Sequence, residues 1–243
     1  MFISAPYLPE AAVTLAVSGF EVPGIKIIPP PEIPVLPPQL RRHADLGLCP
    51  IGAGQVVCPP DTYSYYFRLL TPYGFSVIKG GQALGVSYPA DTAYNVVVVG
   101  NFALMNPDIC DPILLKLLAE RYEIIPVKQG YAKCSVAPIG KTALITADAG
   151  ICRAAERAGL DTLLIENSGV LLPPYENGFF GGACGMTGPK TLTVNGSIDH
   201  MESGGKIRDF LEAHGITAME IHTGAPFDTG SLIPLKIKGN TNP

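Results

Sequence analysis

Residues 141–165 read KTALITADAGICRAAERAGLDTLLI, and this stretch carries the pattern that decides the fold. Lys141–Thr146 is a short run rich in β-forming residues, and Asp148 is placed to cap a helix over Ile151–Ala158. A glycine ends that helix, because glycine readily adopts the left-handed backbone found at helix ends. Thr162–Ile165 then begins a second strand. The stretch therefore predicts a strand–helix–strand unit.

The same order recurs on both sides of this stretch, with a glycine at or near the end of each helix. The predicted helices cover Glu10–Val17, a Tyr-rich segment ending near Leu70, Pro112–Arg121, Ile151–Ala158 and Lys206–His214. The strands that flank them are Phe2–Ser4 and Phe20–Val22, Gln55–Cys58 and Phe75–Ile78, Phe102–Met105 and Glu123–Val127, Lys141–Thr146 and Thr162–Ile165, and Lys190–Val194 and Thr217–Ile221. Any α/β protein alternates such elements, but five copies of about 49 residues each favour a true repeat.

A further strand, here called the head strand, is predicted before each copy. The head strands are placed at His43–Leu48, Asn95–Val99, Cys134–Ala137, Cys184–Met186 and Asp228–Ile233. The first copy lacks one and the last head strand has no copy after it, so we expect the segment near Ser231–Leu235 to pair with Phe2–Ser4. Joining them closes a ring, which leaves no exposed sheet edge.

These patterns predict an α/β fold that forms one domain over residues 1–243. We expect a pseudo-fivefold ring of strand–helix–strand repeats, closed by the N- and C-terminal strands, with the head strands at the centre and the helices outside. The Pro-rich segment Pro29–Pro38 is then a linker between the first two copies.

Composition narrows the classes of function. A net charge of −4 and a pI near 5.6 argue against a nucleic-acid partner. No apolar stretch is long enough to span a membrane, and no signal segment precedes the first strand. The six cysteines form no CxxC pair and no zinc spacing, so we expect free thiols, a cytoplasmic protein, and neither metal nor cofactor. The sequence predicts no particular oligomeric state.

The closed repeats, together with His43-Ala44-Asp45, resemble the pentein, or guanidino-group-modifying, superfamily over nearly the whole chain. That superfamily includes arginine deiminase, dimethylargininase, agmatine deiminase and amidinotransferases. It also includes a ribosome anti-association factor that uses the same ring without catalysis. The resemblance implies a five-bladed α/β propeller with a central cavity.

The enzymes of this superfamily use a cysteine nucleophile, a histidine of an H-x-D motif, and acidic residues that hold the guanidinium group. The resemblance implies that Cys134 is the nucleophile, His43 the acid/base, Asp228 its acidic partner and Asp45 a substrate ligand. Asn95 and Cys184 are further candidate substrate-binding residues at other head strands. A second acidic ligand is expected in the segment Gly182-Ala183-Cys184-Gly185, which has none. Either the substrate is then not a simple guanidine, or an acid such as Glu166 or Glu176 reaches in.

These residue types suit attack on a guanidinium carbon. A thiolate attacks this poor electrophile best, a neighbouring Lys133 would lower the thiol pKa, and a histidine can protonate the departing nitrogen. Structural roles are also open: Cys134 as a small core residue, His43 in a solvated loop and Asp228 as a turn cap.

Cys184, in a Gly-rich segment, is the rival nucleophile. Gly-rich surroundings suit close approach of the backbone to a ligand, and equally suit tight packing. The sequence thus predicts a Cys-dependent hydrolase or transferase acting on a guanidine or amidine compound. The alternative is a non-catalytic pentein-fold binding protein.

Overall fold

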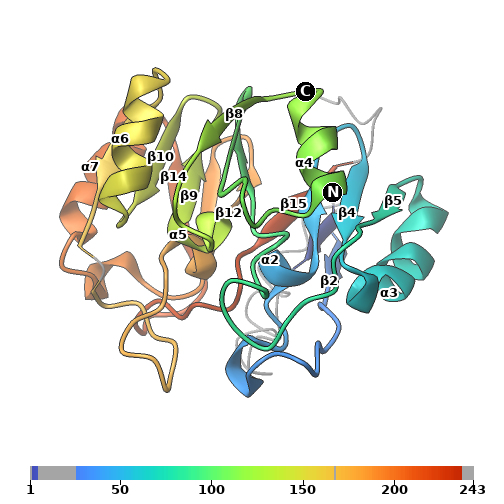
Figure 1. Ribbon diagram of the computed structural model, residues 1–243. Coiled ribbons are helices and arrows are strands. Elements are labelled where there is room, and N and C mark those ends of the chain that lie inside the picture. The colour runs from blue at the N-terminus through green and yellow to red at the C-terminus, as the bar shows by residue number, and fades with distance from the viewer. Residues whose placement is uncertain (1, 5–25, 167, 237–243) are drawn as a thin grey trace.

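The computed structural model of the chain describes residues 2–4, 26–166 and 168–236. In these ranges the strands form five sheets of three strands each (Figure 1). The first sheet contains β1 (Phe2–Ser4), β2 (Lys26–Ile28) and β15 (Ile233–Leu235), and the second contains β3 (Cys49–Pro50), β4 (Gln55–Cys58) and β5 (Ser76–Lys79). The others are β6 (Val97–Val99), β7 (Phe102–Met105) and β8 (Glu123–Pro126); β9 (Val136–Ile139), β10 (Ala143–Thr146) and β11 (Asp161–Leu164); and β12 (Cys184–Gly188), β13 (Thr191–Val194) and β14 (Thr217–Glu220).

All five sheets share one pairing pattern. The middle strand pairs in parallel with one neighbour and antiparallel with the other. In four sheets a helix joins the parallel strands: α3 (Pro60–Leu70), α4 (Pro112–Ala119), α6 (Ala149–Arg157) and α7 (Gly204–Ala213). The four later copies of the predicted unit are therefore confirmed. The predicted helix Glu10–Val17 and strand Phe20–Val22 lie outside the described residues.

Local signals in the sequence set the helix ends. The Asp148 carboxylate accepts hydrogen bonds from the backbone N–H groups of Gly150 and Ile151, at 2.7 and 2.9 Å, and so caps α6 as predicted. Gly159 follows the helix with a φ of 85°, a left-handed conformation that glycine adopts without strain.

The first sheet joins segments from opposite ends of the described chain. β1 pairs antiparallel with β15, with Phe2 opposite Leu235 and Ser4 opposite Ile233. The predicted pairing of these two segments is therefore confirmed.

Four of the five predicted head strands begin too early. The short helix α2 (Ala44–Gly47) precedes β3, and α5 (Ala132–Ser135) precedes β9. β6 begins at Val97 and β15 at Ile233, whereas the predicted Cys184–Met186 does lie in β12. The physical reason is that the backbone just before these strands bonds to distant groups instead of a neighbouring strand. For example, the Asp45 N–H donates to the Gly230 carbonyl oxygen at 3.2 Å.

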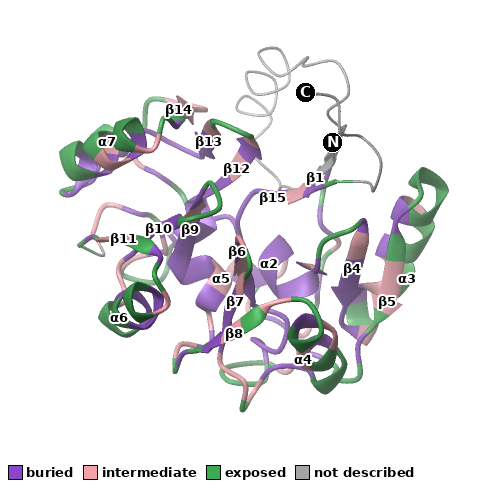
Figure 2. Cartoon of the chain, turned by 90° about the horizontal axis from the view of Figure 1, so that it is seen from above, coloured by how far each residue is buried: buried purple, intermediate pink, exposed green. Residues whose placement is uncertain are grey.

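The four long helices lie outside the sheets, whereas β6, β9, β12 and β15 lie on the inner side (Figure 2). β6 contacts β9, β9 contacts β12, and β12 contacts β15. Each head strand therefore lies beside the next one along this series. No helix in the described ranges is long and apolar enough to cross a membrane.

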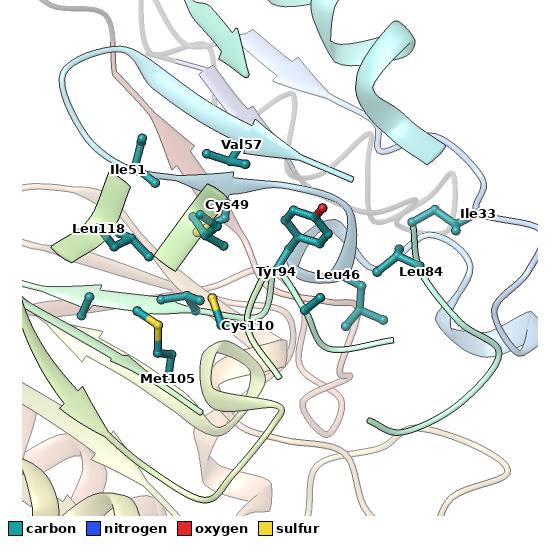
Figure 3. Close-up of a cluster of buried hydrophobic side chains, with 14 of the residues drawn as sticks. Ile33, Leu46, Cys49, Ile51, Val57, Leu84, Tyr94, Met105, Cys110 and Leu118 are labelled. Carbon is teal, nitrogen blue, oxygen red and sulfur yellow. The ribbon is translucent and has the colours of Figure 1, made fainter. Parts of the chain in front are cut away.

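Neighbouring sheets pack through shared apolar clusters. Figure 3 shows one cluster, in which Cys49 and Val57 of the second sheet pack with Met105 of the third. Ile33, from the Pro-rich linker, is buried in the same cluster. This linker is therefore part of the core between two sheets, so that it fixes the chain just before His43.

Candidate functional site

Three of the predicted site residues line one cavity. His43, Cys134 and Asp228 border a cavity of about 230 Å³, and each side chain is more than nine-tenths buried. They come from the segments that precede β3, β9 and β15. The structure thus brings together a thiol, an imidazole and a carboxylate that are far apart in the sequence.

Asp228 faces the imidazole and also supports the local backbone. Its Oδ1 lies 4.0 Å from His43 Nδ1 and accepts a hydrogen bond from the Gly230 N–H at 3.0 Å. Its Oδ2 accepts from the Phe179 N–H at 2.9 Å. Burial raises the pKa of Asp228, and the neighbouring His43 opposes this shift. The carboxyl therefore combines the predicted pairing with His43 and the alternative role of a turn cap.

Asp45 and Asn95 both form hydrogen bonds with the Cys134 thiol. The Cys134 thiol donates to Asp45 Oδ2 at 3.1 Å, and Asn95 Nδ2 donates to the sulfur at 3.2 Å. Asn95 Oδ1 accepts from the backbone N–H groups of Lys133 and Cys134, at 2.7 and 3.2 Å. Neither Asp45 nor Asn95 lines the cavity, so their contacts fix the thiol and the short helix that carries it.

The pKa of Cys134 is raised, contrary to the expectation that Lys133 would lower it. Burial is the main cause, and the carboxylates of Asp45 and Asp228 add to it. The Lys133 ammonium group instead donates to Ser231 Oγ at 2.9 Å. Both effects favour the protonated thiol over the thiolate.

Ser231 is a site residue that the sequence did not single out. Its hydroxyl oxygen lies 2.6 Å from Asp45 Oδ2, where it donates, and it accepts from Lys133 Nζ. The residue has a φ of 68°, which is uncommon for a residue with a side chain. Lys133, Ser231, Asp45 and Cys134 thus form one continuous hydrogen-bonded chain. Asp45 Oδ1 has no hydrogen-bond partner among the described residues.

Two glycines allow the charged groups to approach the backbone. A Cβ at Gly182 would lie 2.1 Å from Asp228 Oδ1, and one at Gly230 would lie 2.3 Å from the His43 Cα. No side chain larger than hydrogen fits at either place without movement. Of the two interpretations of the Gly-rich segment, tight packing around Asp228 is therefore the one that the contacts support.

The remaining candidates lie away from the cavity. Cys184 is fully buried in an apolar cluster, and burial raises its pKa to about 12. Glu166 is exposed and pairs with Lys206 at 3.9 Å, and Glu176 is also exposed. None of these three side chains borders the cavity, so neither Glu166 nor Glu176 supplies the second acidic ligand there.

A second hollow lies on the other side of the imidazole and Asp228. It has a volume of about 350 Å³, and both His43 and Asp228 also border it. Arg41 and Arg42 line it, and each pairs with Glu32, at 3.3 and 3.4 Å. The cations of this hollow are therefore already engaged by a carboxylate.

Comparison with solved structures identifies the fold as that of the pentein superfamily. An amidinotransferase of saxitoxin biosynthesis from Microseira wollei superposes with a TM-score of 0.59 at 12% identity, covering 98% of this chain and 84% of that one. The dimethylarginine dimethylaminohydrolase of Pseudomonas aeruginosa, as a cysteine-to-serine mutant complexed with citrulline, superposes with a TM-score of 0.57 at 10% identity. The match covers 91% of this chain and 92% of that one. The inosamine-phosphate amidinotransferase of Streptomyces griseus superposes with a TM-score of 0.56 at 11% identity, covering 96% of this chain and 81% of that one.

The family itself is defined by sequence. The chain belongs to the "Family of unknown function (DUF6873)", whose model matches residues 13–233. No curated protein matches the sequence. The solved neighbours are thus guanidino-modifying enzymes, while the sequence family has no assigned activity.

Proposed function

We propose that this chain binds a small guanidine or amidine compound in the cavity and acts on it as a Cys-dependent hydrolase or transferase. One observation carries the proposal: His43, Cys134 and Asp228 border the same cavity. Asp228 would pair with the cationic group, Cys134 would attack its carbon, and His43 would transfer protons. Enzymes that modify guanidino groups among the structural neighbours support this class of ligand.

The cavity would lie at the centre of a closed, five-bladed propeller formed by residues 1–243 as one domain. The pairing of β1 with β15 and the contacts along β6, β9, β12 and β15 support this closure. In such a ring the segments before the head strands face a common axis. That arrangement accounts for a site built from short segments far apart in the sequence.

A bound cation would activate the thiol. The carboxylates of Asp45 and Asp228 raise the pKa of Cys134, and a guanidinium ion in the cavity, beside Asp228, would oppose this effect. On attack, the sulfur–carbon bond forms while the thiol proton passes to Asp45, which already accepts its hydrogen bond. The departing nitrogen takes a proton from His43 as its bond to carbon breaks. Water, or an acceptor amine in a transferase, then adds to the carbon and returns a proton to His43. The sulfur–carbon bond breaks, and the departing sulfur takes its proton back from Asp45.

A second candidate function is binding without chemistry. The feature that favours it is the environment of Cys134, since burial and two nearby carboxylates raise the pKa of its thiol. In that case Asp45 and Asn95 only anchor the thiol as a small packing group. The ligand would be the same, but no bond would break.

We further propose a cytoplasmic location. All six cysteines are free thiols and all are buried. Such thiols persist in reducing compartments. Cell fractionation with a periplasmic or secreted marker as reference would test this location.

The decisive experiment measures turnover and binding together. Guanidine and amidine compounds are incubated with wild-type protein, Cys134→Ala and Cys184→Ala, and the released ammonia or amine is quantified. We expect turnover by the wild type and by Cys184→Ala, and none by Cys134→Ala, although calorimetry still detects binding. Binding without turnover by the wild type would favour the non-catalytic function. Turnover by Cys134→Ala would contradict the assignment of the nucleophile.

A further inference from the structure

Most of the cavity surface is apolar. Leucine and aromatic side chains contribute six of its lining residues: Leu40, Leu46, Tyr131, Leu172, Tyr175 and Phe179. Besides the three groups assigned above, the polar side-chain atoms of the described lining belong to Asn177 and to the hydroxyl groups of Tyr131 and Tyr175. Among the described residues that line the cavity, none is a lysine or an arginine. The charged contacts are thus confined to one end of an apolar chamber.

The apolar walls are fixed in position. Leu40, Leu46 and Leu172 belong to the buried cluster that joins the second and third sheets. The Tyr131 hydroxyl donates to Asp91 Oδ2 at 2.7 Å, so it is already engaged. Its ring centroid lies 6.1 Å from that of Phe179. With the Tyr131 hydroxyl engaged, aromatic and aliphatic carbon makes up most of the surface that these residues offer to a ligand.

Apolar character continues outside the cavity. Tyr175 borders it and is 44% exposed, and Tyr88, which is 52% exposed, packs on Tyr131 with ring centroids 5.8 Å apart. Leu171 and Phe227 form a β-bridge and are 45% and 38% exposed. Exposed apolar side chains that gather beside a cavity indicate a surface for apolar ligand groups.

A carboxylate on the ligand would meet no lysine or arginine among the described residues that line the cavity. Burying an unpaired carboxylate is costly, and the nearby cations of Arg41 and Arg42 lie in the second hollow, paired with Glu32. An alkyl or aryl group would instead replace water against leucine and aromatic carbon. We infer that the ligand is a guanidine or amidine bearing an apolar, uncharged substituent, rather than a guanidino amino acid. This inference rests on the proposed function and names its class of ligand.

Calorimetry with four compounds tests the inference: methylguanidine, benzylguanidine, L-arginine and benzyl alcohol. We expect benzylguanidine to bind about tenfold more tightly than methylguanidine and L-arginine, because an apolar group is transferred from water. Benzyl alcohol, which lacks the cation, should bind more weakly than benzylguanidine. L-arginine binding as tightly as benzylguanidine would overturn the inference.

A matched pair of variants locates the contact. Tyr175→Ser removes an aromatic group from the lining, and Phe67→Ser removes one of the same exposure, 44%, from the outer helix α3. Tyr175→Ser should weaken the binding of benzylguanidine several-fold and leave the binding of methylguanidine unchanged. Phe67→Ser should change the affinity for neither compound. Equal weakening of both ligands by Tyr175→Ser would contradict an apolar subsite.

The two proposals fail in different ways. Tight binding of benzylguanidine without turnover would remove the catalytic proposal and uphold the ligand class. Preferred turnover of L-arginine would uphold the catalytic proposal and overturn the ligand class.

Discussion

Replacing Gly182 with alanine should strongly destabilise the protein through Asp228. The added Cβ would lie 2.1 Å from Asp228 Oδ1 and 2.4 Å from its Cγ, so the carboxyl must move. Movement breaks at least one of its bonds to the Phe179 and Gly230 N–H groups, and a hydrogen bond to a charged group contributes about 1.5–3 kcal/mol. Overpacking adds about 1–3 kcal/mol. We therefore expect a loss of about 4 kcal/mol in the free energy of unfolding.

Urea unfolding at pH 7, followed by circular dichroism, measures this loss. Gly205→Ala is the matched control, because its added Cβ would meet nothing within 4 Å beyond its chain neighbours and the adjacent backbone of its own helix, and the position is inside α7. It should be neutral or stabilising by up to about 1 kcal/mol. The clash also predicts that Gly182→Ala lowers the free energy of unfolding by less when Asp228 is already replaced by alanine. A Gly182→Ala protein within about 1 kcal/mol of the wild type would refute the reasoning.

Two further predictions concern the hydrogen-bonded chain around the thiol. Asp45→Asn removes one of the carboxylates that raise the pKa of Cys134, so iodoacetamide should alkylate Cys134 at lower pH than in the wild type. Mass spectrometry of the peptide that contains Cys134 measures this alkylation, and a pH profile that does not shift would contradict the prediction. Ser231→Ala should destabilise the protein more than Ser231→Gly, by about 1 kcal/mol in urea unfolding, because only glycine adopts a φ of 68° without strain. Equal costs would mean that the backbone at Ser231 is unstrained.

The strand–helix–strand units could be predicted because their signals are local. Asp148 caps its helix within three residues, and Gly159 ends it. The short helices before the head strands could not be predicted in this way. A four-residue helix such as α5 is too short to show a periodicity, and its N–H groups bond to Asn95, which is 38 or 39 residues away in the sequence.

The candidate site could be predicted only in part. Three of its residues followed from the resemblance to a known superfamily, but the contribution of Ser231 did not. Its hydroxyl group bonds to Asp45, which is 186 residues away in the sequence. Its left-handed φ could not be predicted either, because serine rarely adopts such a backbone conformation. In the same way, the raised pKa of Cys134 depends on carboxylates contributed by two distant segments.

The pairing of β1 with β15 sets an order of events in folding. The two strands come from opposite ends of the described chain, and closing so long a loop is slow and entropically unfavourable. Ser231 lies just before β15 and bonds to Asp45, so we expect this contact to form together with the pairing of β1 and β15. A nascent or partly folded chain therefore lacks the assembled environment of Cys134. Completion of the fold and completion of the site are one event.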